Sequence, residues 1–420
     1  MKYENVIEKV YSTERLHAAW QQVKKNAGAG GIDRMTVAEF ERREAELLAL
    51  IQRRLQEGRY RFRPARRVLI PKEGTGKMRK LGIPTVMDRV TSQSMNLALA
   101  EIFDPEFTES NFGFRRGQSQ HKAIEHVRRY VKERYDWCAS IDLHSFFDEI
   151  PHDLIIRLIR RKVADEQLIT LVARALKAGV MVDGQFEKTT KGCPQGSPLS
   201  PLISNIVLNE LDQELERRGL RYARWADDFV VLLKSQRSAQ RVGEGITGYL
   251  ENTLGLQVNQ EKSLVAPVKE VVFLGFQILR NKIRVSGKAR QKFKEKIRRM
   301  TKRNNPLSMQ DIIIELNLYL RGWCGYFRIQ EFRILFRDLD AWIRSRLRSI
   351  QLKKWKNPRK FQRMMCQAGW PPEQSQRTWI RMNKWQSVER RPVRFVLNLE
   401  WFRQQGLYFL NDFTAPTLRG

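Results

Sequence analysis

The sequence Arg224-Trp225-Ala226-Asp227-Asp228 places two adjacent carboxylates between two apolar runs. The runs 220–226 and 229–233 have the composition of β-strands, which predicts a hairpin with both acids at its tip. Neighbouring like charges disfavour each other's ionisation unless a cation neutralises them. The pair therefore indicates a site for a hard divalent cation such as Mg²⁺, although an ordinary acidic turn has the same composition.

A third carboxylate, Asp142, follows the run Trp137-Cys138-Ala139-Ser140-Ile141, which predicts a short buried strand. Acids on different strands suit two-metal phosphoryl transfer, because carboxylates must bridge two ions roughly 3.5–4 Å apart. In that chemistry one ion activates the primer 3′-hydroxyl and the other stabilises the leaving pyrophosphate. We therefore predict that Asp142, Asp227 and Asp228 are catalytic and bind two Mg²⁺ ions, with Mn²⁺ as an alternative.

Between the acids lies Gly192-Cys193-Pro194-Gln195-Gly196-Ser197-Pro198, which is rich in turn-forming residues. Glycines and prolines at this density predict a turn whose backbone approaches a ligand closely. An apolar stripe with helical spacing follows between Leu202 and Leu211. The turn therefore lies next to a helix, at a position suited to a bound substrate.

In this order, Asp142, the Pro-Gln-Gly turn and the Ala-Asp-Asp hairpin resemble the palm of a reverse transcriptase. The likeness is to the reverse transcriptase–maturases that bacterial group II introns encode, and it runs from about residue 27 to residue 327. Further motifs of this family are similar to Ile70-Pro71-Lys72, 79–89 and 111–117 (fingers), 272–276 (base of the thumb), 320–327 (maturase-type thumb) and 28–33 (an extra fingers loop). Ordered motifs at suitable spacing are far more specific than any one motif.

The resemblance implies an α/β (α+β) fold, a right-hand polymerase with fingers, palm and a helical thumb of the maturase type. The expected parts are 1–135 (N-terminal extension and fingers), 136–280 (palm with some fingers elements), 281–358 (three-helix thumb) and 359–420 (small basic C-terminal region that binds nucleic acid). The residue pattern agrees, since it predicts a strand pair near 65–70 and 78–83 and helices from Lys288 onward.

The resemblance also implies residue roles around the three acids. The Leu143 backbone carbonyl is an expected extra metal ligand. Lys72 and Arg79 match positions that clamp the incoming triphosphate, Arg79 with a bidentate fork and Lys72 as a point charge. Gln195 matches a residue that contacts the nucleotide and the template.

Two adjacent aromatic residues compete for the role of a steric gate. Phe147 matches the residue that stacks on the sugar and excludes a 2′-hydroxyl, and Phe146 is the other candidate. Either ring could instead belong to the core. The resemblance favours Phe147.

The sequence departs from the family pattern at several positions. Trp225 replaces a tyrosine before Ala-Asp-Asp, and His144 and Ser145 replace an acidic–basic pair after Asp142. Arg34 and Arg116 stand where the family usually has glycine and proline. None of these changes removes a predicted metal ligand, so polymerase chemistry is expected to be retained.

The basic charge is concentrated in the last third of the chain. The protein has 77 Lys and Arg against 46 Asp and Glu, and residues 281–420 contain 32 basic and 10 acidic residues. Such an excess predicts salt-dependent binding to nucleic-acid phosphates. Apolar stripes at helical spacing in this part predict three amphipathic helices with their Lys and Arg outside. The expected nucleic-acid contacts are Arg115, Lys292, Lys296, Arg344, Arg348 and Lys353.

The four cysteines are scattered, without a Cys-x-x-Cys pair. This pattern argues against disulfides and against a structural zinc site, and fits a reducing compartment. The first residues show neither a signal peptide nor a membrane span, so a cytoplasmic protein without a membrane partner is expected. The Cys/His endonuclease module of many group II intron proteins is expected to be absent.

Together these features predict an RNA-directed DNA polymerase that copies group II intron RNA into cDNA and binds that RNA to assist splicing and mobility. Its expected partners are an RNA template, a DNA or RNA primer, intron RNA and dNTPs, and the oligomeric state is open. Alternatives are a domesticated group II-like enzyme of DNA repair or defence, and a splicing maturase with little polymerase activity. Retron and diversity-generating enzymes are less suited, because the Leu320 to Phe327 thumb and Gln195 are present.

Overall fold

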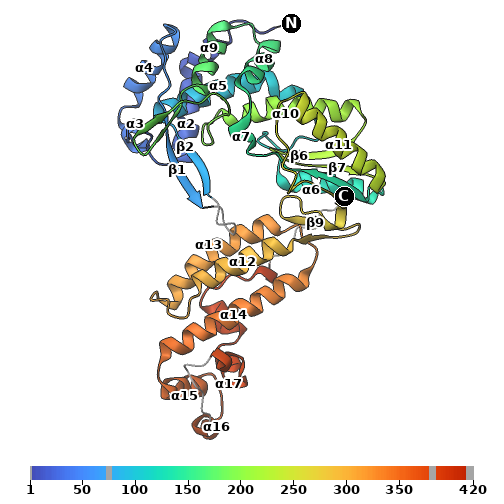
Figure 1. Ribbon diagram of the computed structural model, residues 1–420. Coiled ribbons are helices and arrows are strands. Elements are labelled where there is room, and N and C mark those ends of the chain that lie inside the picture. The colour runs from blue at the N-terminus through green and yellow to red at the C-terminus, as the bar shows by residue number, and fades with distance from the viewer. Residues whose placement is uncertain (1, 72–77, 378–384, 413–420) are drawn as a thin grey trace. The chain divides into compact units, whose positions relative to one another are not determined.

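A computed structural model describes residues 2–71, 78–377 and 385–412 of the chain. These residues form two compact units, Met1–Leu274 and Gly275–Gly420 (Figure 1). The N-terminal unit holds two four-stranded sheets among helices, and the C-terminal unit is mainly helical. The mixed helix-and-sheet class that the sequence predicts is confirmed.

The N-terminal unit contains most of the strands. Its helices are α1 (Val6–Tyr11), α2 (Thr13–Asn26), α3 (Val37–Arg42), α4 (Glu44–Gln56), α5 (Val86–Phe103), η1 (Asp104–Glu106), α6 (Gln120–Lys132), α7 (Phe146–Glu149), α8 (His152–Lys162), α9 (Glu166–Leu176), α10 (Ser200–Arg217), α11 (Gln236–Asn252) and η2 (Val268–Glu270). Its strands are β1 (Ala65–Pro71), β2 (Met78–Ile83), β3 (Trp137–Ile141), β4 (Val180–Val182), β5 (Gln185–Glu187), β6 (Arg221–Trp225), β7 (Asp228–Leu233) and β8 (Leu264–Pro267).

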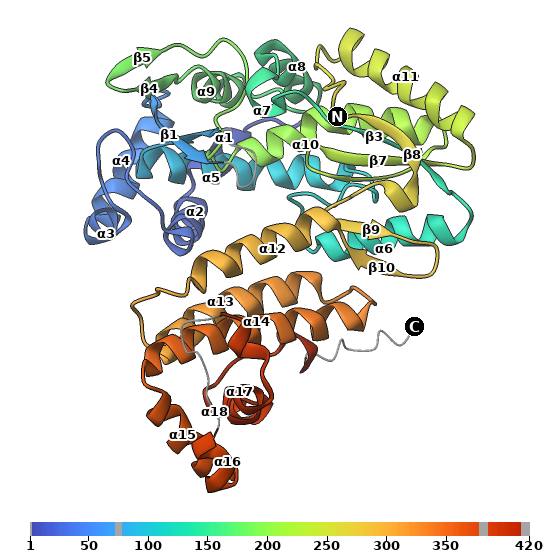
Figure 2. The ribbon, with the colours of Figure 1, turned by 60° about the horizontal axis from the view of Figure 1, so that its bottom comes forward.

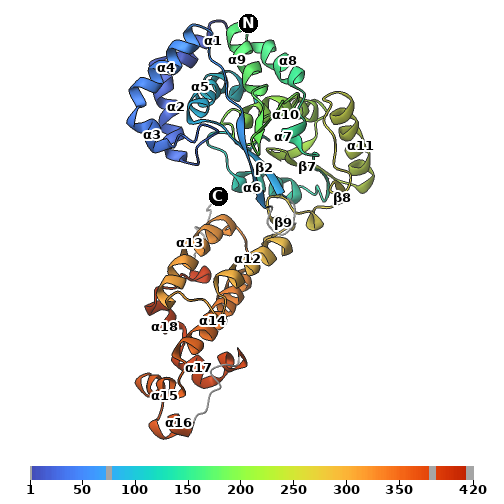
Figure 3. The ribbon, with the colours of Figure 1, turned by 60° about the vertical axis from the view of Figure 1, so that its left-hand side comes forward.

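The first sheet has the strand order β2-β1-β4-β5. β1 and β2 pair antiparallel, as the sequence predicts, and the turn between them lies outside the described residues. Helices α1, α2 and α4 gather around the long buried helix α5 beside this sheet (Figure 3). Thr85 begins α5 because its hydroxyl accepts a hydrogen bond from the Asp88 amide, which caps an otherwise unpaired N–H.

The second sheet, with the order β6-β7-β3-β8, carries the predicted acidic hairpin. Phe229 to Leu233 of β7 are almost completely buried, and Cys138 and Ala139 of β3 are buried as well. Helix α11 packs along β3 and β8, and α6 packs along β6 (Figure 2). Burial on both faces explains the near-continuous apolar runs of β3 and β7.

The C-terminal unit begins with the small hairpin β9 (Phe276–Ile278) and β10 (Ile283–Val285). Its helices are α12 (Gly287–Met300), α13 (Met309–Phe327), α14 (Arg333–Trp355), α15 (Pro358–Gln367), α16 (Pro372–Arg377), η3 (Trp385–Glu389), α17 (Arg391–Val396), α18 (Leu399–Gln404) and η4 (Leu410–Asp412). The three amphipathic helices that the sequence predicts correspond to α12, α13 and α14.

An aromatic cluster holds these three helices together. The Trp323 ring on α13 lies 4.3 Å from Phe293 of α12 and 5.9 Å from Phe336 of α14, measured between ring centroids. Serine side chains cap the first turns of α12 and α13. The apolar stripes therefore face the interior of the unit, which leaves most of the charged positions at its surface.

No helix in the described part of the chain is long and apolar enough to cross a membrane.

Candidate active site

The register of the second sheet brings the three predicted acids together. Ile141 of β3 pairs with Phe229 of β7, so the next residue, Asp142, lies level with Asp228 at the same sheet edge. Trp225 pairs with Asp228 across the hairpin, which leaves Ala226 and Asp227 as the two-residue turn. Ala226 has a φ of 57°, as two-residue hairpins with the favoured twist require. Acids 85 residues apart in sequence thus meet at one end of β3 and β7.

Asp142 is held by the segment that precedes β8. Its amide donates to the Ser263 hydroxyl at 3.1 Å, and its carbonyl accepts from the Asn259 amide at 2.8 Å. The Lys262 ammonium lies 3.4 and 3.3 Å from the two carboxylate oxygens of Asp142. Lys262 therefore forms an ion pair with the first acid, and both side chains are partly open to solvent.

Mutual repulsion and partial burial shape the ionisation of the hairpin acids. Burial raises the pKa of Asp227, the charge of Asp142 raises it further, and Arg79 and Lys262 act in the opposite direction. Although Asp228 is partly exposed, the protein around its carboxylate and the charges of Asp227 and Asp142 raise the pKa of Asp228 to about 7. A positive ion between these acids would remove the cost of keeping them ionised together.

The donor set fits divalent ions that share their ligands with a substrate. Within the described residues, no group of three or more His, Cys, Asp or Glu side chains is placed to hold a metal ion. Mg²⁺ usually takes one or two carboxylates and completes its shell with water and substrate phosphates. Leu143 lies in a short bridge to Val258 whose hydrogen bonds use the Asp142 carbonyl and the His144 amide, so these bonds do not consume the Leu143 carbonyl.

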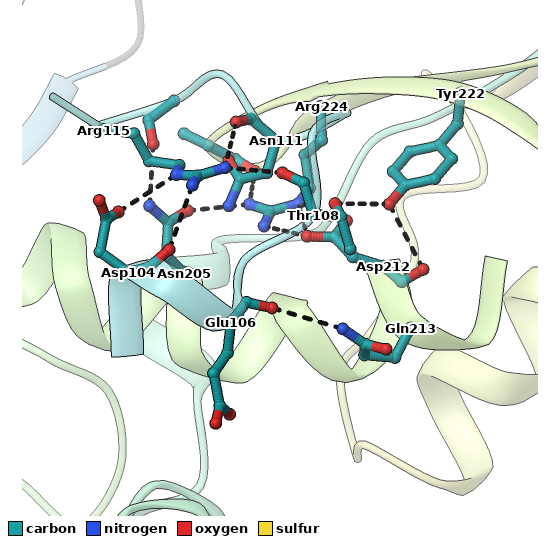
Figure 4. A network of polar contacts seen from close by, with 12 residues as sticks. Asp104, Glu106, Thr108, Asn111, Arg115, Asn205, Asp212, Gln213, Tyr222 and Arg224 are labelled. Carbon is teal, nitrogen blue, oxygen red and sulfur yellow. Dashed lines mark hydrogen bonds and ion pairs between the residues drawn. The ribbon is translucent and has the colours of Figure 1, made fainter. Parts of the chain in front are cut away.

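A buried ion pair contacts the acidic turn, and Figure 4 shows the polar contacts of its two residues, Arg224 and Asp212. Arg224 and Asp212 are both fully buried, and the Arg224 Nε donates to the Asp212 carboxylate oxygens at 2.8 and 3.1 Å. The Arg224 Nη1 donates to the Asn205 side chain and to the Ala226 carbonyl, each at 3.0 Å. The guanidinium therefore ties the turn that carries Asp227 to helix α10.

The second fingers motif supports the same turn from another side. The Phe112 amide donates to the Arg224 carbonyl, and the Gly113 carbonyl accepts from the Asn205 side chain. A Cβ atom at Gly113 would lie 2.2 Å from the Ala226 backbone nitrogen, closer than any real contact. Glycine is therefore required at this position, because the backbone passes directly against the turn.

The Pro-Gln-Gly turn links the first sheet to the helix after Asp142. The Gly82 amide on β2 donates to the Gln195 carbonyl at 2.8 Å, and the Cys193 amide donates to the Phe147 carbonyl at 2.7 Å. Gly196 has a φ of 120°, and a Cβ there would lie 2.3 Å from the Gly82 carbonyl. The turn thus fixes Gln195 and Phe147 in one assembly.

Three of the four predicted nucleotide-binding residues, Arg79, Phe147 and Gln195, lie on segments that meet at this turn. Arg79 on β2 is exposed, and its charge reaches Asp227 strongly enough to affect the pKa of that acid. Phe147 is half-buried, whereas Phe146 is 2% exposed and belongs to the core, so only Phe147 presents a ring that a sugar could contact. Lys72 lies outside the described residues.

Arg115 has a different environment from the one expected of a phosphate contact. Its guanidinium donates to the side chain and carbonyl of Asp104 and to the carbonyls of Thr108 and Asn111 (Figure 4). These bonds leave little donor capacity for a phosphate. These contacts indicate that Arg115 instead holds in place the loop that contains Asp104, Thr108 and Asn111.

The expected contacts on α12 and α14 divide into two groups. Lys292 and Lys353 are exposed and Lys296 is half-exposed, so all three remain available to a ligand. Arg348 is 7% exposed, its Nε donates to the Leu397 carbonyl, and burial lowers its pKa to about 10. Burial also lowers the pKa of Arg344, which stacks over Phe409. Arg348 therefore packs inside the unit, contrary to the surface position expected for it.

Two features of the site were not found from the sequence. Lys262 lies 120 residues from Asp142 in the chain, and a lysine in a polar stretch gives no signal of such a pairing. The Arg224–Asp212 pair was also missed, although an arginine within a predicted buried strand is a signal that a partner exists.

Comparisons with known proteins identify two families in the sequence. Residues 70–278 match the family described as "Reverse transcriptase (RNA-dependent DNA polymerase)", and residues 290–368 match "Group II intron, maturase-specific domain". The chain is 33% identical over 299 residues to Protein YkfC of Escherichia coli (strain K12), which covers 62% of this chain and 78% of that protein.

More distant relatives carry intron names. The chain is 29% identical over 349 residues to the Group II intron-encoded protein LtrA of Lactococcus lactis subsp. cremoris, covering 67% of this chain and 57% of LtrA. It is 27% identical over 331 residues to the Putative COX1/OXI3 intron 1 protein of Saccharomyces cerevisiae, covering 65% of this chain and 39% of that protein. Since one chain joins a reverse transcriptase domain to a maturase-specific domain, the protein belongs to the reverse transcriptase–maturase family of group II introns.

Proposed function

We propose that the protein is an RNA-directed DNA polymerase that copies group II intron RNA into cDNA, and that it binds this RNA to assist splicing and mobility. The observation that carries the proposal is the meeting of Asp142 with the Asp227–Asp228 hairpin, within electrostatic reach of Arg79. RNA template, primer, intron RNA and dNTPs are the partners this chemistry requires. The scattered cysteines support the cytoplasm as its place of action.

The three acids and the Leu143 carbonyl would hold two Mg²⁺ ions. When bound, such ions lower the pKa of the attacking hydroxyl and stabilise charge on the leaving group. Arg79 is placed to bind the triphosphate, because a guanidinium forms bidentate hydrogen bonds with phosphate oxygens. The turn around Gln195 and the Phe147 ring would orient the nucleotide, and positioning of this kind supplies much of the rate in phosphoryl transfer.

The C-terminal unit supplies a surface for nucleic acid. Lys292 and Lys296 on α12 and Lys353 on α14 are accessible, and the matched maturase-specific domain spans these helices. Lysines on helix surfaces bind phosphates without reading bases, so the contact is expected to tolerate different sequences. This surface supports binding of both a primer–template and a folded intron RNA.

The intact acids favour an active polymerase over a maturase that only assists splicing. Primer extension on an RNA template with dNTPs and Mg²⁺ tests the proposal directly. The wild-type chain should extend the primer, chelation of the ions should stop extension, and the Asp227→Ala variant should serve as the inactive reference.

The Phe147→Ala substitution should relax the selection against ribonucleotides. An aromatic face beneath the sugar leaves no room for a 2′-hydroxyl, and alanine opens that space. We expect the ratio of rNTP to dNTP incorporation efficiency to rise by roughly tenfold or more, a change of about 1.4 kcal/mol in discrimination. Phe146→Ala is the matched control. Relaxed selection against ribonucleotides in that variant alone would show that Phe146, and not Phe147, is the gate.

The Lys262→Ala substitution should strengthen binding of divalent ions to the acids. Lys262 pairs with Asp142, and an exposed pair of this kind contributes about 0.2–1 kcal/mol that an entering ion must overcome. Mn²⁺ affinity, measured by electron paramagnetic resonance, should therefore increase by up to about fivefold. Lys262→Arg, which keeps the charge, should stay near wild type, and weaker Mn²⁺ binding by Lys262→Ala would contradict the assignment.

A further inference from the structure

Residues 59–64 form a segment between α4 and β1 in which exposed arginines alternate with inward-facing residues. Arg59, Arg61 and Arg63 are exposed, whereas Tyr60 is 2% exposed and Phe62 is half-buried. The Tyr60 and Phe62 rings lie 5.1 Å apart on the inner side. Strict alternation of this kind is the side-chain pattern of an extended chain.

The inner side of this segment is firmly attached to the unit. The Tyr60 hydroxyl donates to the Asp88 carboxylate at 2.9 Å, and the Arg63 amide donates to the same carboxylate at 3.2 Å. The Arg174 side chain donates to the carbonyls of Gly58 and Tyr60. The three outward arginines therefore extend from a backbone that is ordered before any ligand arrives.

The outer side is strongly positive. Arg53 and Arg54, at the end of α4, are exposed, so residues 53–63 carry five arginines and one acid, Glu57. Two of the three alternating arginines have an acidic neighbour, since Arg59 lies 3.6 Å from Glu57 and Arg63 lies 3.8 Å from Asp33. Arg59 and Arg63 keep 79% and 59% of their side chains exposed. Exposed pairs of this kind are weak, and the excess of arginines over acids in this segment attracts a polyanion.

The spacing and direction of the segment favour one kind of polyanion, an extended nucleic-acid strand. Alternate residues of an extended chain lie roughly 6–7 Å apart, which is comparable to the separation of successive phosphates along an extended nucleic-acid strand. The segment runs straight into β1, whose partner β2 is hydrogen-bonded to the Pro-Gln-Gly turn through Gly82 and Gln195. A nucleic-acid strand bound along the arginines is therefore directed toward the Pro-Gln-Gly turn, beside the acids.

We propose that Arg59, Arg61 and Arg63 form an arginine ladder that binds the phosphates of the single-stranded RNA template before it enters the active site. The ladder contacts the backbone and leaves the bases unread, because guanidinium groups on an exposed edge bind phosphate without sequence information. This inference rests on the proposed polymerase function, and it adds a template-binding surface in the N-terminal unit to the basic helices of the C-terminal unit.

The test is the salt dependence of binding by the Arg59→Gln/Arg61→Gln/Arg63→Gln variant. The probes are a primer–template with a 5′ single-stranded RNA overhang and the same duplex with blunt ends, each followed by fluorescence anisotropy. For the overhang, the slope of log affinity against log salt should become shallower by about two units, since each phosphate contact on a single strand contributes about 0.7. Affinity at about 0.1 M salt should fall roughly 10- to 100-fold. Blunt duplex should bind as it does to wild type.

The matched control replaces three exposed arginines of the same unit, Arg157 on α8 and Arg237 and Arg241 on α11, with glutamine. This variant has the same net charge, so an effect of overall charge alone would weaken both triple variants equally and overturn the ladder. Equal losses on overhang and blunt duplex would also overturn it, because the ladder would then bind duplex. The binding measurement needs no catalysis, so an inactive wild-type enzyme would contradict the proposed function without deciding this inference.

Discussion

Primer extension by the Asp227→Ala variant should fall at least about a hundredfold below wild type. Asp227 lies at the turn between β6 and β7, within electrostatic reach of Asp142 and Asp228. Its removal takes away a ligand that two ions need, and metal-assisted stabilisation of the transition state is worth several kcal/mol. A hundredfold loss corresponds to about 2.7 kcal/mol. Extension rates on an RNA template at saturating dNTP measure the effect.

A measurement of the affinity for primer–template distinguishes this loss of catalytic rate from a folding defect. The affinity of Asp227→Ala for primer–template should remain near that of wild type, because the basic helices of the C-terminal unit are unchanged. Asp153→Ala, which removes an exposed carboxylate on α8, is the matched control and should extend primers normally. A rate for Asp227→Ala within about tenfold of wild type, a barrier change under about 1.4 kcal/mol, would rule out the assignment of this acid to the metals.

The Asp212→Ala substitution should lower the free energy of unfolding by about 3–5 kcal/mol. It leaves the buried Arg224 guanidinium without its carboxylate, and an unpaired charge in the interior is strongly destabilising. A loss of this size should lower Tm by roughly 6–20 °C, measured by calorimetry on the full chain. Glu244→Ala on α11, which removes an exposed acid, should change Tm little.

A double substitution distinguishes stability from catalysis at the same pair. Asp212→Leu/Arg224→Met removes both charges, and it should be more stable than Asp212→Ala because no ion remains uncompensated. It should still be a poor polymerase, because the hydrogen bond from Arg224 to the Ala226 carbonyl is lost and the turn is no longer fixed. If the free energy of unfolding of Asp212→Ala lies within about 1 kcal/mol of the wild-type value, the Arg224–Asp212 pair does not anchor the turn.

Sequence patterns within single segments were sufficient to predict individual strands and helices. The apolar runs around Asp227 predicted β6 and β7 to within a residue or so, and the run before Asp142 predicted β3. The stripes beginning at Phe293 and Ile312 predicted α12 and α13, because the period of an amphipathic helix is visible in sequence. The meeting of the acids needed more, since it depends on the antiparallel pairing of β3 with β7, which the family resemblance supplied.

Contacts between distant segments could not be predicted in this way. Arg344 and Arg348 lie on the same helix as exposed lysines, and only the packing of residues near Leu397 against α14 shows that Arg348 is covered. Lys262 comes close to Asp142 only after the chain has passed through α11. In each case the charge was visible in the sequence, while its partner was set by the tertiary fold.

The acidic turn is held in place by contacts from the protein interior. Arg224 holds the Ala226 carbonyl from the interior, and Gly113 presses against the backbone of the turn, so neither support uses the side chain at position 225. Trp225 is only half-buried. Position 225 is therefore a place where the side chain beside the acids can be varied by mutagenesis while the backbone that carries Asp227 and Asp228 keeps its shape.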